Sequence, residues 1–176
     1  DTGSYTAITN LVNNSGVVAS DTAGVGTARI NLAATTYGTD KVIFGYGDNG
    51  SNVSLTNLVS NSGVVASDTT GVGTARDQIA AAGYGSTGQA LFGYGNTGAG
   101  FLSVTNLISN SGVVSADTAG VGTTRSFLSA TAYGADKAIF GYGNNGSNLS
   151  MTNLVSNTGV VGSDVSGVGT ARHALS

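Results

Sequence analysis

Arginine and aspartate recur at matching positions along this chain, and their charges are the first candidates for specific chemistry. An aspartate stands eight residues before each of the four arginines; the pairs are Asp21 and Arg29, Asp68 and Arg76, Asp117 and Arg125, and Asp164 and Arg172. A guanidinium and a carboxylate can form a charge-assisted ion pair across the turn between them. We therefore expect four structural ion pairs. A ring of four arginines could instead bind an anion, but each arginine would first have to leave its aspartate.

Tyrosines beside Asn or Asp form a second candidate site. The recurring segment Phe-Gly-Tyr-Gly, followed by Asp or Asn, supplies six candidate ligand-binding residues: Tyr46, Asp48, Tyr94, Asn96, Tyr142 and Asn144. An aromatic face can stack on the C–H groups of a sugar while amides and carboxylates bind its hydroxyls, so a glycan is the ligand that this pattern suggests. The alternative, which we favour, is that these tyrosines pack between neighbouring repeats.

The composition excludes several other kinds of chemistry. The 176-residue chain has no cysteine and one histidine, His173, which rules out thiolate nucleophiles, disulfides and multi-histidine metal clusters. No Ser–Asp arrangement accompanies His173, so we expect no enzymatic activity, no metal and no cofactor. A net charge of −3 with six scattered cations argues against a nucleic-acid partner. No segment approaches the roughly 20 apolar residues of a transmembrane helix, so we expect no membrane partner.

A four-fold internal repeat organises the chain. The string Ser-Gly-Val-Val, with Thr replacing Ser in the last copy, begins at residues 15, 62, 111 and 158, so the spacings are 47, 49 and 47 residues. Within one copy, β-branched and aromatic runs alternate with Gly, Asn and Asp clusters, which indicates consecutive antiparallel strands. In the first full copy we expect four strands, at residues 30–35, 41–46, 53–59 and 63–67.

Four strands in a repeat of about 45 residues are typical of one blade of a β-propeller. We therefore predict an all-β protein built as a β-propeller of four-stranded antiparallel blades, with a β-solenoid as the alternative. The propeller is favoured because small residues, as in Ala33-Ala34, Ala80-Ala81 and Ser129-Ala130, suit strands that crowd around an axis. The single repeat domain, 1–176, then divides into the outer strands of a blade at 1–25, blades at 26–72, 73–121 and 122–168, and an inner strand at 169–176.

The order of motifs within one repeat resembles the kelch repeat. Thr27-Ala28-Arg29 looks like the arginine that opens the inner kelch strand, Phe44-Gly45-Tyr46-Gly47 takes the place of the double glycine, and residues 54–61 take the place of the Val-x-x-Tyr-Asp strand. Here a tyrosine separates the glycines, and Val64-Val65 stands where kelch repeats carry tryptophan. The resemblance implies a kelch-like blade used for binding or assembly. The repeats are also similar to those of phage and marine viral structural proteins, which implies a virion or extracellular location.

The two ends of the chain align with the interior of a repeat. Asp1 corresponds to Asp48 and Ser176 to Ala33, so the fourth copy lacks the segment equivalent to residues 34–47. We expect one blade to lack a strand, and open sheet edges recruit partners. The expected function is a non-catalytic structural and assembly module that self-associates through blade edges, as a homo-oligomer or a longer repeat assembly in a viral or extracellular fibre. The alternatives are a lectin-like carbohydrate-binding propeller and an engineered or excised repeat fragment without a ligand.

Overall fold

The computed structural model describes residues 4–175, and these residues form strands, turns and loops without any helix. Nine strands make three separate sheets, each an antiparallel meander of three strands in chain order. The strands are β1 (Ala33–Tyr37), β2 (Lys41–Gly45), β3 (Thr56–Val59), β4 (Ala80–Tyr84), β5 (Gln89–Asn96), β6 (Phe101–Ile108), β7 (Ser129–Tyr133), β8 (Lys137–Gly141) and β9 (Thr152–Val155). The all-β prediction is therefore confirmed, with one sheet for each of the three complete repeats.

The strand boundaries differ from the expected ones where the backbone turns left-handed. The inner strand begins at Ala33 rather than at residue 30, because Asn31 has a φ of 53° that breaks the extended conformation. The second strand ends at Gly45, directly before Tyr46, which has a φ of 62°. In the second repeat, β5 continues to Asn96 with a register shift between Gly93 and Gly95. Tyr94 and Tyr142 share this φ value. The tyrosine of Phe-Gly-Tyr-Gly is thus aimed away from its own sheet in every complete repeat.

The fourth strand that we predicted for each repeat does not form as a continuous strand. After β3 the outer segment makes only isolated bridges to it, Val59 with Val65 and Thr56 with Thr69. Between these bridges the outer segment has one residue more than β3, so it bulges outward. Corresponding bridges occur in all four copies, beginning with Val12 to Val18 and Thr9 to Thr22. The prediction of four-stranded blades is replaced by three-stranded sheets with a bulged outer segment.

An asparagine side chain explains this interruption. The amide of Asn57 on β3 donates to the carbonyl oxygen of Ala66 at 3.1 Å and to the carboxylate of Asp68 at 2.8 Å. The first of these bonds satisfies a carbonyl oxygen of the outer segment that a regular ladder would pair with a backbone N–H group. The side chain therefore holds the outer segment beside β3 while keeping it out of ladder register.

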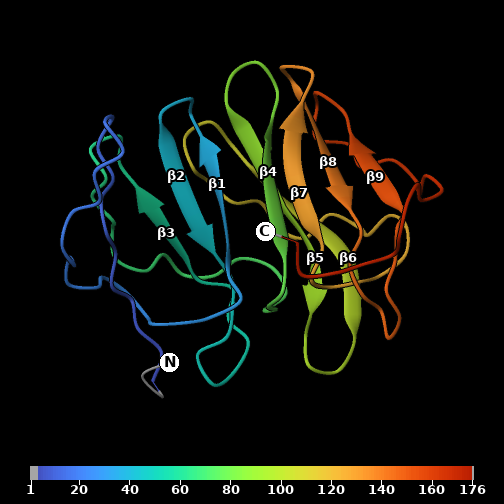
Figure 1. Cartoon of the computed structure of the whole chain (residues 1–176), viewed down its shortest axis with the longest axis horizontal. Helices are drawn as coiled ribbons and strands as arrows, with labels where there is room; N and C mark the ends of the chain where they lie inside the picture. Colours follow the sequence, from blue (N-terminus) through green and yellow to red (C-terminus); the bar gives the residue numbers. More distant parts are fainter. Residues whose placement is uncertain (1–3, 176) are drawn as a thin grey trace.

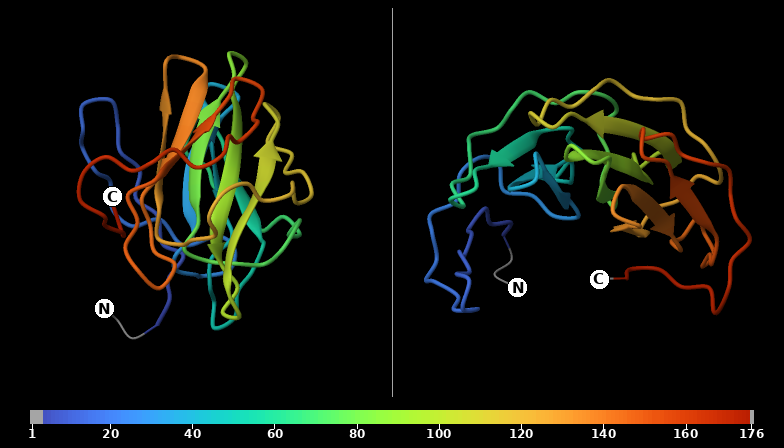
Figure 2. Two further views of the ribbon diagram at one scale, coloured as in Figure 1. Left: turned by 90° about the vertical axis from the view of Figure 1, so that its right-hand side faces the viewer. Right: turned by 90° about the horizontal axis from the view of Figure 1, so that it is seen from above.

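The three sheets are arranged as an arc. The inner strands β1, β4 and β7 contact one another in that order, with β4 in the middle (Figure 1). Seen from above, the sheets fan outward from these strands, and the two ends of the chain lie on the open side of the arc (Figure 2). The small residues named in the prediction differ in burial: Ala80 of the middle strand is buried, Ala34 is exposed, and the other four, Ala33, Ala81, Ser129 and Ala130, are partly buried.

Aromatic pairs fill the spaces between successive sheets. Tyr46 packs edge-on against Phe92 of the second sheet, with ring centroids 5.2 Å apart, and Tyr94 packs in the same way against Phe140 of the third sheet at 5.1 Å. Gly45 allows this approach, because a Cβ there would overlap the Phe92 ring. The core of the molecule therefore lies between the sheets, one apolar cluster for each junction.

Candidate functional site

The arginine of the second repeat is the hub of a buried polar network. Arg76 is fully buried and donates from Nε to the carbonyl oxygen of Tyr94 at 2.7 Å. Its Nη1 donates to the carbonyl oxygen of Thr74 at 2.9 Å, and its Nη2 donates to Oδ1 of Asn106 at 2.7 Å. Asn106 in turn donates to the carboxylate of Asp117 at 2.9 Å, and this carboxylate lies 3.9 Å from Nη1 of Arg76. The planar guanidinium thus satisfies acceptors from three segments at once.

A threonine completes the network. The hydroxyl and the backbone N–H of Thr74 donate to the carboxylate of Asp117 at 2.6 and 3.0 Å. This contact fastens the loop before the inner strand to the outer segment of the same repeat. The network recurs in the other complete repeats, with these members: Thr27, Arg29, Asn57 and Asp68 in the first, and Thr123, Arg125, Asn153 and Asp164 in the third.

The ion pairs differ from those predicted by sequence spacing. Arg29 lies 3.8 Å from Asp68, the aspartate at the end of its own repeat, and Arg76 pairs in the same manner with Asp117. We expected Arg76 to pair with Asp68, eight residues before it. This prediction is wrong, because Thr27 and Asn57 of the first repeat donate hydrogen bonds to the Asp68 carboxylate. In the third repeat, Asn153 links Arg125 to Asp164. The aspartate at the end of a repeat therefore belongs to the network of the arginine at the start of the same repeat, and not to that of the next arginine.

Burial and hydrogen bonding act in opposite directions on these charges. Burial by itself would raise the pKa of Asp117, but hydrogen bonds from Thr74 and Asn106 outweigh it and hold that pKa below its ordinary value. The pKa values of Asp68 and Asp164 are lowered for the same reasons. Burial lowers the pKa of Arg76, opposed by Tyr46 and Asp117, and arginine stays charged because its ordinary pKa is so high. Arg76 and Asp117 are therefore both charged at neutral pH.

The tyrosines of the candidate ligand site lie between the sheets. Tyr46 and Tyr94 are fully buried. The guanidinium of Arg76 lies 4.3 Å from the Tyr46 ring centroid, and the hydroxyl of Tyr46 donates to the carbonyl oxygen of Val72 at 3.0 Å. Neither buried ring can offer a face to a sugar. Tyr142 is partly exposed, but Arg172 stacks on it at 4.0 Å.

The polar members of the candidate ligand site stabilise their own turns. The side-chain oxygens of Asp48, Asn96 and Asn144 each accept the N–H of the glycine two residues later, at 2.8, 2.7 and 2.9 Å. These Asx turns show that each side chain has a structural role within its own turn. Within residues 4–175, no buried side-chain nitrogen or oxygen lacks a hydrogen-bond partner.

The sequence reasoning missed the asparagines and threonines of the network. Asn57, Asn106 and Asn153 are nearly or fully buried, which is unusual for this residue type. A signal for them was present, since the dipeptide Thr-Asn recurs at residues 9–10, 56–57, 105–106 and 152–153. Recurrence of a polar pair inside a predicted strand indicates a buried polar contact.

The two ends of the arc carry incomplete versions of the network. At the N-terminal end, Asn10 donates to Asp21 at 2.8 Å, as Asn57 does to Asp68, and both residues are exposed. At the C-terminal end, Nη1 of Arg172 donates to the carbonyl oxygen of Thr170 at 3.2 Å, and Arg172 is exposed. In the part of the chain that the structure describes, neither Asp21 nor Arg172 has an ion-pair partner.

No group of three or more His, Cys, Asp or Glu side chains in the described range could hold a metal ion. No helix of that range is long and apolar enough to cross a membrane. A scan against protein-family models finds no match to this chain, and a search of curated proteins finds none either.

Proposed function

We propose that this chain is a non-catalytic assembly module whose sheets are blades of an open, kelch-like propeller and whose two ends join copies of the chain. The observation that carries the proposal is that the ends present complementary halves of one polar network. Asp21 and Asn10 form the half at one end, and Arg172 and Thr170 form the half at the other.

The complete repeats show how these halves fit. In the first repeat, Nη2 of Arg29 donates to Oδ1 of Asn57 at 2.6 Å, and the hydroxyl of Thr27 donates to Asp68 at 2.7 Å. Arg172 and Thr170 occupy the positions of Arg29 and Thr27, while Asn10 and Asp21 occupy those of Asn57 and Asp68. Joining the ends of two copies would therefore bring together the threonine, arginine, asparagine and aspartate of one more network, with opposite charges meeting. The carbonyl oxygen that accepts from Nε of Arg29 belongs to Tyr46 and has no equivalent at this junction.

A series of backbone hydrogen bonds supports the same junction. The N–H of Gln78 donates to the carbonyl oxygen of Asn31 at 3.0 Å, Phe127 donates to Gln78 at 3.0 Å, and Ala174 donates to Phe127 at 2.9 Å. Among the described residues, no backbone hydrogen bond involves the N–H of Asn31 or the carbonyl oxygen of Ala174, which stand at the two ends of the series. A hydrogen bond from the N–H of Asn31 in one copy to the carbonyl oxygen of Ala174 in another would continue the series with the same donor and acceptor groups.

The native mass tests this proposal. We expect multi-angle light scattering, read over a range of protein concentrations, to show a defined multimer for the unmodified chain. Arg172→Asp and Asp21→Arg should each dissociate it, and the double variant should restore it because the charges are then exchanged. Asp136→Arg, at a turn outside the network, is the matched control and should leave the mass unchanged. A monomer at all concentrations, or a multimer that tolerates both single reversals, would contradict the proposal.

A further inference from the structure

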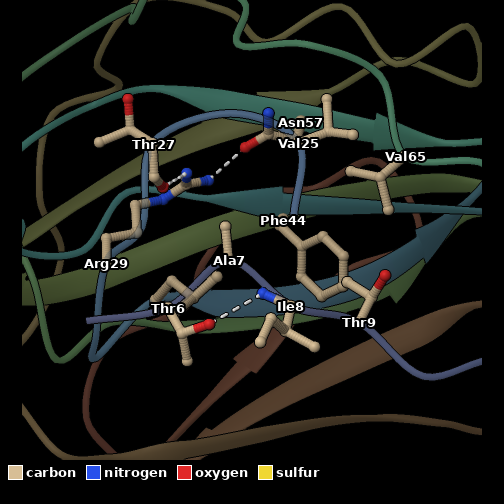
Figure 3. A pocket seen from close by; sticks show the side chains of 11 residues that line it. Thr6, Ala7, Ile8, Thr9, Val25, Thr27, Arg29, Phe44, Asn57 and Val65 are labelled. Atoms are coloured by element: carbon tan, nitrogen blue, oxygen red, sulfur yellow. Dashed lines mark hydrogen bonds between the residues drawn. The ribbon is translucent and has the colours of Figure 1, made fainter. Parts of the chain in front are cut away.

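A cavity of about 170 Å³ lies at the N-terminal end of the arc (Figure 3). The N-terminal segment, residues 6–9, forms one wall. Val25 and the first complete repeat form the other wall, to which Arg29 and Phe44 contribute their side chains. Figure 3 shows the Phe44 ring and the Arg29 guanidinium on that side. The cavity is therefore bordered by one aromatic ring and one buried cation.

The equivalent space in the second repeat is filled by a tyrosine. The Tyr46 ring packs edge-on against Phe92 and lies beneath Arg76. Its hydroxyl donates to the carbonyl oxygen of Val72 at 3.0 Å. These three partners define a tyrosine socket, which consists of a phenylalanine ring, an arginine plane and a valine carbonyl.

The third repeat shows the same arrangement. Tyr94 packs against Phe140 with ring centroids 5.1 Å apart, lies 4.2 Å beneath Arg125, and donates to the carbonyl oxygen of Val121 at 3.2 Å. Two occupied sockets therefore agree in every partner. The tyrosine socket is therefore a recurring feature of the repeat.

The first repeat carries the same three groups without a tyrosine. Val25, Arg29 and Phe44 stand at the positions of Val72, Arg76 and Phe92. An engineered cavity of about 150 Å³ is enough to take up a benzene ring, so a space of about 170 Å³ suits a phenol ring. In the described residues, no aromatic ring stacks on Arg29, whereas rings lie beneath Arg76, Arg125 and Arg172.

Backbone groups around the cavity specify how a guest would enter. In the filled socket, the N–H of Tyr46 donates to the carbonyl oxygen of Leu55 at 2.9 Å, and the N–H of Gly47 donates to that of Arg76 at 3.1 Å. The corresponding acceptors at the cavity are the carbonyl oxygens of Ile8 and Arg29. A guest in the same pose must therefore supply a tyrosine N–H and the N–H of the next residue.

The occupied sockets also specify the residues beside the tyrosine. Gly47 has a φ of 108°, which favours glycine after the tyrosine. Gly45 precedes it, and a Cβ there would overlap the ring of Phe92. The guest segment therefore needs small residues on both sides of its tyrosine.

We infer that this cavity is a binding site for an extended peptide segment in which a tyrosine stands between two glycines. Such a segment would insert between residues 6–9 and the first repeat, a form of strand addition in which backbone bonds give affinity and the ring gives specificity. The inference goes beyond self-association, because it rests on the cavity and not on the charged half-networks. Its test is accordingly separate.

The test uses a fluorescein-labelled peptide with the sequence of residues 41–47, Lys-Val-Ile-Phe-Gly-Tyr-Gly, and reads its fluorescence anisotropy against the full chain. We expect saturable binding that weakens at least tenfold when alanine replaces the tyrosine of the peptide. Repeating the titration with the Arg172→Asp variant separates peptide binding from self-association, since that substitution lies at the opposite end of the arc.

Two tryptophan variants locate the binding. Val25→Trp should fill the socket and weaken binding at least tenfold, because Val25 lines the cavity. Val25 is 43% exposed, so the variant is expected to fold, which its circular dichroism spectrum will verify. Val168 holds the equivalent position at the other end and is 86% exposed, so Val168→Trp is the matched control and should bind normally. Failure of the tyrosine peptide to bind, equal binding of both peptides, or full affinity in Val25→Trp would overturn the inference.

Discussion

Replacing Arg76 by methionine tests whether the buried arginine network holds the repeats together. The substitution keeps much of the apolar stem but removes three hydrogen bonds, the contact with Asp117 and the stacking on Tyr46. Breaking one partner out of a buried charged pair costs about 3–5 kcal/mol. The side chain of Asp117 is 28% exposed, so water compensates part of its loss, whereas Asn106 is fully buried and keeps an unpaired oxygen. We expect the free energy of unfolding to fall by about 3–4 kcal/mol.

Arg172→Met is the matched control. Arg172 also stacks on a tyrosine, but its side chain is shown donating one hydrogen bond, to the carbonyl oxygen of Thr170 at 3.2 Å, and the residue is exposed. Exposed contacts of this kind contribute from nothing to about 1 kcal/mol. We therefore expect a loss below about 1 kcal/mol for this variant.

Urea unfolding at pH 7, followed by far-ultraviolet circular dichroism and tyrosine fluorescence, measures both variants. Tyrosine fluorescence is usable because the chain contains seven tyrosines and no tryptophan. Arg29→Met is an intermediate case, because Arg29 makes the same hydrogen bonds as Arg76 but, among the described residues, has no ring beneath it. This variant replaces Arg76→Met in the comparison if Arg76→Met does not fold. Equal losses for Arg76→Met and Arg172→Met, or a loss below about 1 kcal/mol for Arg76→Met, would refute the reasoning.

Two further predictions concern glycine packing and acid. Gly45→Ala should destabilise the protein by about 1–3 kcal/mol, because the new methyl group would overlap Phe92. Gly141→Ala, whose Cβ would meet its nearest neighbour at 3.5 Å, should be neutral, and similar melting temperatures for the two variants would argue against close packing at Gly45. Because the pKa of Asp117 is lowered by folding, its contribution is present above the unfolded pKa of about 3.9 and is lost as the pH falls through the folded pKa. Asp117→Asn should therefore reduce stability at pH 7 and flatten its decline between pH 5 and pH 2 in urea titrations. An unaltered slope in this variant would be the contrary result.

Short-range features of this fold could be predicted from the sequence. The hairpin between β1 and β2 was expected because apolar runs flank a glycine-containing turn, and residues 41–45 do form a strand. The small residues of the first strand in each repeat were a separate prediction, and of those named Ala80 is buried whereas Ala34 is exposed. These features depend on neighbouring residues, whose pattern is visible in the chain.

Long-range features could not be predicted in the same way. The ion-pair partner of Arg76 depends on which carboxylate lies near it. The bulge in the outer segment determines this, and the spacing of Asp and Arg along the chain does not reveal the bulge. The side chain of Asn57 replaces backbone ladder bonds, so a segment with strand-like composition, residues 63–67, does not become a strand. In both cases a buried amide side chain decides the structure. Hydrophobic periodicity and strand propensity do not predict the hydrogen bonds that such a side chain makes.

The tyrosine of Phe-Gly-Tyr-Gly makes each repeat dependent on the next. The carbonyl oxygen of Tyr46 accepts a hydrogen bond from Arg29 in its own repeat, while its ring lies beneath Arg76 of the following repeat. A repeat therefore contributes to its neighbour a contact that it cannot make for itself, which gives a chain of nearest-neighbour interactions. In such a chain the first repeat is stabilised least, because Arg29 has its acceptors but no ring. Filling the tyrosine socket from outside would give the first repeat the contact that Tyr46 gives the second, so ligand binding should raise the stability of the N-terminal end first.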